Sequence, residues 1–417
     1  MTFPLPSARG PVVGEMVVPG SKSETNRALV LAALADGPSR LVGALASRDS
    51  ALMIDALEAL GVEVLADGEA LCVTPPVRFR GAQGIDCGLA GTVMRFVPPL
   101  AALADGPSSF VGDPHASERP MGPLLDGLRQ LGVGVDGEAL PFSLTPPAAL
   151  GGEAAIDASG SSQFVSGLLL AGARLPEGLR LTHTGDRLPS LPHIQMTVEM
   201  LRARGVTIDQ PDERTWVVRP GPIAALDTTI EPDLTNAAVF LAAAAATGGR
   251  VTVPGWPPAS IQPGALFLDV AERMGAVVER GADRVTVAGF GPLRGVDVDL
   301  TAASELTPLV AALGALAEGT TVIRGVAHIR GHETDRLAAL VAELTRAGAS
   351  ARETDDGLVV EGGSPLVPAV LRTYADHRLV HFAALLALGT PGIAVNDLQC
   401  VSKTMPRFPE DWARLVG

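Results

Sequence analysis

The sequence predicts an α/β fold with two domains, each made of three repeats of one unit. Three observations indicate this. Helices of small apolar residues recur with a period of roughly 70 residues. A glycine follows each of these helices and precedes a segment rich in strand-forming residues. A second helix then leads to a closing strand, so six such units fill the 417 residues.

The first helix of each unit is expected to be buried, because its Ala, Leu and Val residues leave little polar surface. These helices are predicted at residues 28–35, 93–104, 164–173, 236–246, 307–317 and 379–388. The glycines that end them are Gly37, Gly106, Gly178, Gly248, Gly319 and Gly389. If the buried helices of a domain are parallel, their starts meet on one face, where partial positive charge attracts anions.

The second helices and the domain boundary complete the predicted fold. Second helices are expected at residues 50–60, 121–131, 193–204, 266–274 and 334–347. A Pro/Gly-rich connection at 220–227 separates the third unit from the fourth. We therefore expect a first domain at 14–226 and a second at 227–417, which the short segment 1–13 crosses back to complete.

Composition restricts the function classes. A net charge of -14 argues against non-specific nucleic-acid binding, so an anion site must be a local basic pocket. Cys72, Cys87 and Cys400 have no metal-ligand spacing and cannot all pair, which suggests no metal and a reducing cytoplasm. The first residues lack the apolar core of a signal peptide, and no apolar run is long enough for a membrane span.

The strongest candidate for an anion site lies at residues 18–27. Gly20 permits a tight turn, and Ser21 and Ser23 suit the start of a helix. Lys22 and Lys403 are the only lysines among 32 basic residues, which indicates positions that need a compact ammonium group. The stretch alone is also compatible with a capped helix bearing solvated cations. It is not a Walker A motif, because Ser21 separates Gly20 from Lys22, and no Gly-x-Gly-x-x-Gly follows a strand.

Polar residues recur at equivalent helix starts in the other units. Loops that open the first helices hold Gly91–Thr92 with Arg95, then 159–163, 231–235, 304–307 and 374–378. Loops that open the second helices hold Arg119, Ser190, 332–336 and Lys403. Capping alone explains residues such as Ser161, Ser162 and Thr92 equally well. Capping does not explain the five cations at these helix starts, which indicate a ligand with several negative charges. These cations are Lys22, Arg119, Arg336, Arg378 and Lys403.

At these residues the sequence resembles the 5-enolpyruvylshikimate-3-phosphate (EPSP) synthase family over essentially its whole length. The most specific pieces are 19–23 with Arg27, 90–92 with Arg95, 161–163, 333–336, and 376–378 with Lys403. The resemblance implies an enolpyruvyl transferase fold: two domains, each of three βαβαββ-type units with buried parallel helices, that close on their substrates. It implies transfer of the enolpyruvyl group of phosphoenolpyruvate to the 5-hydroxyl of shikimate 3-phosphate, on the route to chorismate and the aromatic amino acids. A monomer without metal or organic cofactor is expected.

The resemblance also implies a set of binding residues. For shikimate 3-phosphate they are Lys22, Ser23, Arg27, Ser161, Ser162, Gln163, Ser190, Glu305 and His332. For phosphoenolpyruvate they are Lys22, Gly91, Arg119, Gln163, Arg336, Arg378 and Lys403. Gly91 fits the pattern of relatives that the herbicide glyphosate inhibits, because a Cβ there would crowd an inhibitor in the phosphoenolpyruvate site.

The chemistry needs one group to take the hydroxyl proton and another to protonate C3 of phosphoenolpyruvate. Glu305 stands where many relatives carry Asp as the proton acceptor. Alternatively, the carboxylate of Glu305 only stabilises the start of a helix through the helix dipole. Lys22 is the first candidate for the acid, with Glu333 and His377 as further participants. The sequence departs from the family at Leu89, His115, His193 and His332, and the last replaces a common Lys, so its charge is expected to depend on pH.

Two other functions are compatible with parts of the pattern. The first is a UDP-N-acetylglucosamine enolpyruvyl transferase, which shares the repeats but carries Lys-Asn in the first motif and a reactive Cys in a mobile loop. Here the motif is Lys22-Ser23, and residues 112–119 contain no Cys. The second is a small-anion binding protein without catalysis, against which the presence of Glu305, Lys22 and Arg378 argues, because a binder needs no proton acceptor.

Overall fold

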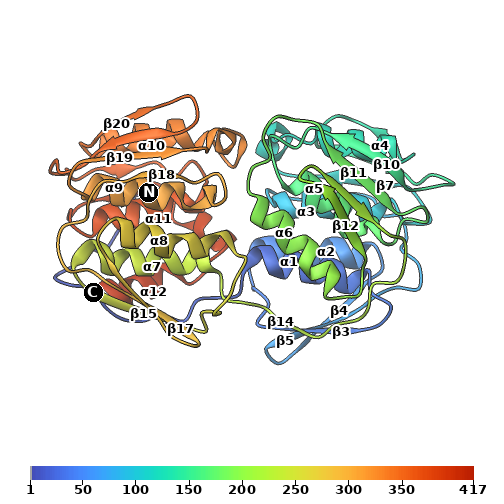
Figure 1. Cartoon of the computed structure of the whole chain (residues 1–417), viewed down its shortest axis with the longest axis horizontal. Helices are drawn as coiled ribbons and strands as arrows, with labels where there is room; N and C mark the ends of the chain where they lie inside the picture. The colour runs from blue at the N-terminus through green and yellow to red at the C-terminus, as the bar shows by residue number, and fades with distance from the viewer. Residues whose placement is uncertain (1) are drawn as a thin grey trace. The chain divides into compact units, whose positions relative to one another are not determined.

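The computed structural model describes residues 2–417 and divides the chain into two compact units (Figure 1). Unit 1 contains the residues up to Pro19 together with Glu231–Gly417, and unit 2 is Gly20–Ile230. The chain therefore passes between the units twice, and each unit is described by itself below.

Helices alternate with strands along both units. The α-helices are α1 (Lys22–Ala33), α2 (Arg48–Ala59), α3 (Gly91–Ala101), α4 (Gly122–Gln130), α5 (Gln163–Gly172), α6 (Leu191–Arg202), α7 (Leu234–Thr247), α8 (Phe267–Arg273), α9 (Thr307–Leu316), α10 (Arg336–Arg346), α11 (His377–Ala387) and α12 (Phe408–Val416). Short 3-10 helices are η1 (Pro114–Glu118), η2 (Pro263–Leu266), η3 (Ser304–Leu306), η4 (Ala327–Gly331) and η5 (Gln399–Lys403).

The strands of unit 2 form three four-stranded sheets. Their orders are β14-β3-β5-β4, β6-β7-β9-β8 and β10-β11-β13-β12. The strands are β3 (Ser39–Val42), β4 (Glu63–Asp67), β5 (Ala70–Thr74), β6 (Ile85–Asp86), β7 (Ser108–Val111), β8 (Gly134–Asp136), β9 (Phe142–Thr145), β10 (Gly152–Ile156), β11 (Leu179–His183), β12 (Ile208–Asp212), β13 (Thr215–Val218) and β14 (Thr228–Thr229).

The strands of unit 1 form two four-stranded sheets and one three-stranded sheet. Their orders are β16-β17-β15-β2, β18-β19-β21-β20 and β1-β23-β22. The strands are β1 (Phe3–Pro4), β2 (Val13–Glu15), β15 (Arg250–Pro254), β16 (Val277–Arg280), β17 (Arg284–Ala288), β18 (Asp297–Asp299), β19 (Thr320–Arg324), β20 (Ser350–Glu353), β21 (Leu358–Glu361), β22 (Val370–Leu371) and β23 (Ala394–Val395).

The same strand pattern recurs in each four-stranded sheet. A parallel pair begins it, as β6 with β7 and β18 with β19, and two antiparallel strands follow. In two sheets the parallel partner comes from a distant part of the chain: β14 pairs with β3, and β2 pairs with β15. These pairings place the crossings after Pro19 and Ile230, a few residues beyond the boundaries expected from the sequence. The α/β fold of repeated units is confirmed.

The first helix of each repeat forms the core, as predicted. In unit 2, α1, α3 and α5 pack against one another, and in unit 1 α7, α9 and α11 do so. Most of their residues are buried, including the Ala-rich run of α7. α3 and α5 approach closely at Gly167, where an added Cβ would lie 2.2 Å from the carbonyl oxygen of Arg95. This close packing positions the two helix starts described below.

The helices begin earlier than the apolar pattern predicted. α1 starts at Lys22, α3 at Gly91 and α11 at His377, so the polar residues assigned to loops form the first helical turns. The N–H groups of a first turn need acceptors and favour anions, so cations such as Lys22 and Arg378 add to the positive charge there instead of neutralising it. Within residues 2–417, no helix is long and apolar enough to cross a membrane.

Candidate active site

Arg336 is the centre of a charged cluster in unit 1. It is the first residue of α10, and its side chain is 1% exposed. Its Nε donates to Asp376 at 2.7 Å, and its two terminal nitrogens donate to Glu333 at 2.8 Å and to Glu305 at 3.1 Å. Burial lowers the pKa of Arg336, but these three carboxylates outweigh burial and raise it well above its usual value. The guanidinium is therefore fixed in place and charged.

The cluster contains two more cations, from two further elements. Arg378, in the first turn of α11, lies 3.6 Å from a Glu305 oxygen through its Nε. Lys403, at the end of η5, donates to Glu333 at 2.5 Å and is 6% exposed. The Arg336 cluster is the name used below for its six members: Glu305, Glu333, Arg336, Asp376, Arg378 and Lys403. Three cations thus stand among three carboxylates where the starts of α9, α10 and α11 meet.

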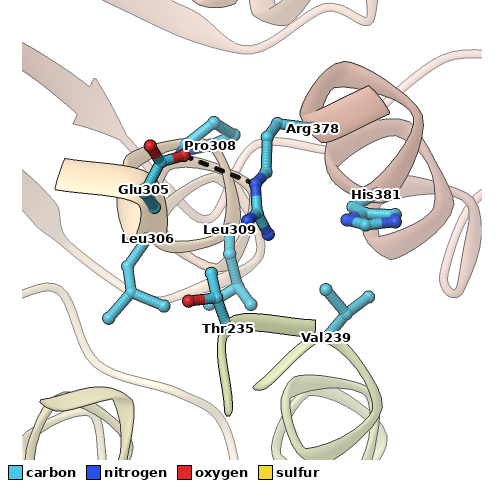
Figure 2. A pocket seen from close by; sticks show the side chains of 8 residues that line it. All are labelled: Thr235, Val239, Glu305, Leu306, Pro308, Leu309, Arg378 and His381. Atoms are coloured by element: carbon cyan, nitrogen blue, oxygen red, sulfur yellow. Dashed lines mark ion pairs between the residues drawn. The ribbon is translucent and has the colours of Figure 1, made fainter. Parts of the chain in front are cut away.

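Glu305 faces a pocket that Figure 2 shows from close by. Its carboxylate points toward Arg378. The rest of the wall consists of Thr235 and Val239 of α7, Leu306, Pro308 and Leu309 at the start of α9, and His381 of α11. Burial raises the pKa of Glu305, but the charges of Arg336 and Arg378 outweigh it and hold the pKa well below its usual range. A carboxylate that is 29% exposed and ionised at neutral pH is available to accept a proton.

Asp376 connects the cluster to the start of α11. It is the N-cap of this helix, fully buried, and its Oδ1 accepts from the Arg378 N–H at 2.9 Å. Asn236 of α7 accepts from Arg378 at 3.4 Å and donates to the Thr404 carbonyl at 3.4 Å. Asp376 therefore fixes the main chain of Arg378 and Asn236 binds its guanidinium. The sequence had not singled out Asn236 as a site residue.

His332 is neutral at pH 7, although the sequence suggested a charge that depends on pH. Its Nδ1 accepts from Arg336 at 3.1 Å, because a guanidinium has no acceptor to offer. Burial, and then the charge of Arg336, lower the pKa of His332 to about 3. His377, which was predicted to take part in catalysis, lies 3.6 Å from Asp376 and is 2% exposed.

Acidification is expected to destabilise unit 1 through its buried histidines. His381 lies across the pocket in Figure 2, is 2% exposed, and burial, and then the charge of Arg378, hold its pKa well below its usual value. The unfolded chain binds more protons below about pH 6.5, so stability falls as pH decreases from there. We expect the Tm to fall by a few degrees between pH 7.5 and pH 5 in thermal denaturation.

His381→Met is expected to reduce that pH dependence, because the variant removes a group that only the unfolded state protonates. His115→Gln is the matched control, since the His115 side chain is 74% exposed. An equal acid-induced fall in Tm for His381→Met and the parent would contradict the explanation.

In unit 2, Lys22 stands at the first position of α1. Ser21 is the N-cap and its Oγ accepts from the Glu24 N–H at 3.4 Å. The Lys22 ammonium lies 3.5 Å from Asp49, whose side chain is 1% exposed. Asp49 was missed in the sequence, where it looks like an ordinary residue in the first turn of α2. Its only distinguishing signal is that it stands at the start of a second helix, as Arg336 does.

Four predicted or motif residues of unit 2 meet where α3 and α5 begin. Arg95 donates to the Gly91 carbonyl and to Gln163 Oε1, both at 3.3 Å, and to the Pro120 carbonyl at 3.0 Å. Arg119 donates to the Leu89 carbonyl at 2.9 Å, so position 89 holds it through the backbone rather than through a side chain. A Cβ on Gly91 would lie 2.8 Å from Arg95 Nη1 and 2.9 Å from Arg119 Nη2.

Arg27 is fully buried, and its donors bind groups inside unit 2. Its Nε donates to Thr197 at 2.7 Å, and its terminal nitrogens donate to the carbonyls of Ser23 at 2.9 Å and of His193 at 3.0 Å. Burial lowers its pKa to about 9, and its guanidinium lies 5.1 Å from the centre of the Phe96 ring. Arg27 therefore joins α1 to α3 and α6.

The remaining serine candidates lie at helix starts. Ser161 accepts from the Gln163 N–H at 3.3 Å, and Ser162 is the N-cap of α5 without a side-chain cap bond. Ser190, the N-cap of α6, has a positive φ of 53°, a conformation that costs free energy in a residue other than glycine. Such strain is typical of functional positions, whereas Ser161 also satisfies the simpler interpretation as a cap.

Comparisons with known proteins agree with one another. Residues 6–412 match a family model described as EPSP synthase (3-phosphoshikimate 1-carboxyvinyltransferase). The chain is 51% identical to a 3-phosphoshikimate 1-carboxyvinyltransferase of Mycobacterium ulcerans, over 99% of this chain and 97% of that protein. It is similar in structure to EPSP synthase from Acinetobacter baumannii, with a TM-score of 0.82, 24% identity, and coverage of 100% and 98% of the two chains. It is also similar in structure to the enolpyruvyl transferase NikO from Streptomyces tendae, with a TM-score of 0.76, 23% identity, and coverage of 99% and 97% of the two chains.

Proposed function

Because the chain belongs to the EPSP synthase family, we propose that the Arg336 cluster contains its proton acceptor and part of its phosphoenolpyruvate site. The enzyme is a 3-phosphoshikimate 1-carboxyvinyltransferase, which transfers the enolpyruvyl group of phosphoenolpyruvate to the 5-hydroxyl of shikimate 3-phosphate and releases phosphate. One observation supports the site above all: Glu305 is the carboxylate that lies against both Arg336 and Arg378 while staying partly exposed.

Glu305 acts as the base that takes the proton of the 5-hydroxyl. In the free enzyme the two guanidinium groups keep the pKa of its carboxyl low, after burial has acted in the opposite direction. An anion that binds Arg336 and Arg378 neutralises part of that charge, so the pKa of Glu305 rises. The base therefore becomes stronger when phosphoenolpyruvate is bound, which is when the reaction needs it.

The two substrates are anions, and each unit offers donors to them. For phosphoenolpyruvate we propose Arg336, Arg378 and Lys403 of unit 1, and Lys22, Gly91, Arg119 and Gln163 of unit 2. For shikimate 3-phosphate we propose Glu305 and His332 of unit 1, and Lys22, Ser23, Arg27, Ser161, Ser162, Gln163 and Ser190 of unit 2. Neutral His332 has its Nε2–H left to donate to a phosphate or hydroxyl, because Nδ1 already accepts from Arg336.

Protonation of C3 of phosphoenolpyruvate makes C2 electrophilic, and the 5-hydroxyl attacks C2. The resulting intermediate then loses a proton from C3 and phosphate from C2. We propose Lys22 as the acid at C3, because an ammonium is a proton donor and Asp49 at 3.5 Å orients it. Glu333 and His377 are the other candidates for this role.

Phosphate release with each acceptor tests the proposed reaction against its alternatives. We expect release from phosphoenolpyruvate with shikimate 3-phosphate and none with UDP-N-acetylglucosamine. Release with the UDP-sugar would favour the related transferase. Calorimetric binding of phosphoenolpyruvate without release with either acceptor would favour a binding protein.

Gly91→Ala is expected to weaken phosphoenolpyruvate binding and leave the fold intact. The new methyl group would lie 2.9 Å from Arg119 Nη2 and 3.1 Å from Gln163 Oε1, so these flexible side-chain ends must move. We expect KM for phosphoenolpyruvate to rise about 10-fold, KM for shikimate 3-phosphate to stay within about twofold, and inhibition by glyphosate to weaken.

Gly122→Ala is the matched control for this substitution, because Gly122 also begins a helix and a Cβ there meets nothing within 4 Å. Steady-state kinetics with each substrate varied in turn measures the effect. Equal KM values for phosphoenolpyruvate in the two variants would remove Gly91 from the proposed site.

We further propose that units 1 and 2 are the two domains of the enzyme and that the chain works as a monomer in the cytoplasm. The free thiols Cys72, Cys87 and Cys400 support a reducing compartment. Analytical ultracentrifugation at working concentrations tests the oligomeric state.

A further inference from the structure

The loop before α11 has an unusual backbone. Tyr374 and Ala375 have φ angles of 53° and 56°, and with Ser190 they are the positive-φ residues other than glycine in the described chain. The Asp376 N–H donates to the Thr373 carbonyl at 2.8 Å, which closes a turn around the two. Left-handed backbone costs free energy in residues with a Cβ, so neighbouring groups must hold this turn.

Glu343 supplies contacts that hold it. Its side chain is fully buried, and Glu343 Oε1 accepts from the Tyr374 hydroxyl at 2.8 Å. Oε2 accepts from the Arg372 N–H and from Arg346 Nε, both at 2.9 Å. The Glu343 carboxylate therefore binds the loop at two points, the Arg372 N–H before the turn and the Tyr374 hydroxyl within it, and Arg346 balances its charge.

α10 holds this loop at two places. Arg336, at its first position, binds Asp376, the last residue of the turn. Glu343, two helical turns later, binds Tyr374 within the turn and the Arg372 N–H before it. On the other side, Asn396 accepts from the Thr373 N–H at 2.9 Å. The turn thus has little freedom, and its exit sets where Asp376 caps α11 and where Arg378 starts.

We infer that Glu343 is a positioning residue for the reaction: by holding the Thr373–Asp376 turn in its left-handed conformation, it places Arg378 for phosphoenolpyruvate and against Glu305. The inference rests on the proposed role of Arg378 as a ligand of phosphoenolpyruvate. Glu343 does not touch the substrate and acts only through the turn.

Glu343→Gln and Tyr374→Phe test the inference. Gln keeps the shape of the side chain but offers one acceptor oxygen and an NH₂ that faces a donor, while Phe removes the hydroxyl alone. We expect kcat/KM for phosphoenolpyruvate to fall by about 10- to 100-fold in Glu343→Gln, with a smaller fall in Tyr374→Phe. KM for shikimate 3-phosphate should change by less than about twofold, because seven of its nine proposed ligands belong to unit 2.

A second substitution is expected to rescue the first. Glycine adopts a φ near 56° without strain, so Ala375→Gly in the Glu343→Gln background should recover most of the lost kcat/KM. Leu344→Ala is the control for a purely structural effect, because Leu344 is buried on the same helix and its apolar side chain cannot hydrogen-bond the turn. It should lower Tm without changing the ratio of the two KM values.

Arg378→Met separates this inference from the proposed function. If Arg378→Met raises KM for phosphoenolpyruvate and Glu343→Gln changes neither substrate's kinetics, the positioning role is wrong and the site stands. If Arg378→Met leaves that KM unchanged, the proposed role of Arg378 fails. A fall in Tm for Glu343→Gln with an unchanged ratio of KM values, as in Leu344→Ala, would also overturn the positioning role.

Discussion

Glu305→Gln is expected to lower kcat by about 10²- to 10⁴-fold, the range that a general base contributes. The amide has nearly the same shape as the carboxylate and can still accept a hydrogen bond from Arg336, but it cannot take the proton of the 5-hydroxyl. Binding of both substrates should persist, because the cations of the cluster remain. Isothermal titration calorimetry for binding, with a phosphate-release assay for turnover, measures both quantities.

Glu305→Asp is the matched control for that loss. It keeps the charge and shortens the arm by one methylene, and the family resemblance implies that Asp can serve at this position, so we expect a loss of at most about 10-fold. A Glu305→Gln enzyme with more than a tenth of the parent kcat would exclude Glu305 as the base.

Arg336→Met is expected to destabilise the enzyme by about 3–5 kcal/mol and to remove its activity. The substitution leaves Asp376, which is fully buried, without its cation and takes the same partner from Glu305 and Glu333. Arg336→Lys should recover little, because an ammonium cannot replace the planar fork that holds three carboxylates at once. Urea denaturation followed by circular dichroism measures the free energy of unfolding.

Arg324→Met is the matched control for stability. Arg324 also binds a carboxylate through two nitrogens, at 2.8 and 2.9 Å from Asp297, but both partners are more than half exposed. Exposed pairs of this kind contribute about 0–1 kcal/mol. Equal losses of stability in Arg336→Met and Arg324→Met would contradict the view that burial makes the Arg336 cluster structurally important.

The core helices could be predicted from the sequence because a fully buried helix consists almost entirely of apolar residues. The Ala-rich run of α7 has no polar face, so it can only lie inside a domain. The start of α11 could not be placed, because His377 interrupts the apolar pattern and helical hydrogen bonding continues through it. The start of α1 was indicated by Ser21, which is its N-cap. The return of the N-terminal segment to unit 1 was expected from the sequence. The pairing of β2 with β15 and of β14 with β3 was not, because it joins distant residues, which no local pattern records.

The candidate site was predicted best where charge is unusual for its surroundings. Arg336, Arg378 and Lys403 stood out as cations at equivalent helix starts of an acidic chain, and the structure brings them together around Glu305 and Glu333. Asp49 and Glu343 were missed, because their carboxylates look like ordinary surface charges of amphipathic helices until their burial is known. Likewise, the sequence could not show that burial and Arg336 lower the pKa of His332, so the charge expected for this residue was wrong.

Deuterium incorporation tests the central claim most directly. The reaction is run in D₂O with phosphoenolpyruvate and shikimate 3-phosphate, and proton NMR follows the methylene signal derived from C3. We expect deuterium to enter this position with the parent enzyme, and to enter at least about 100-fold more slowly with Glu305→Gln at concentrations where it binds both substrates. Phosphate release without deuterium at C3 would contradict protonation of C3, and equal rates of incorporation by the two enzymes would contradict Glu305 as the base of the reaction.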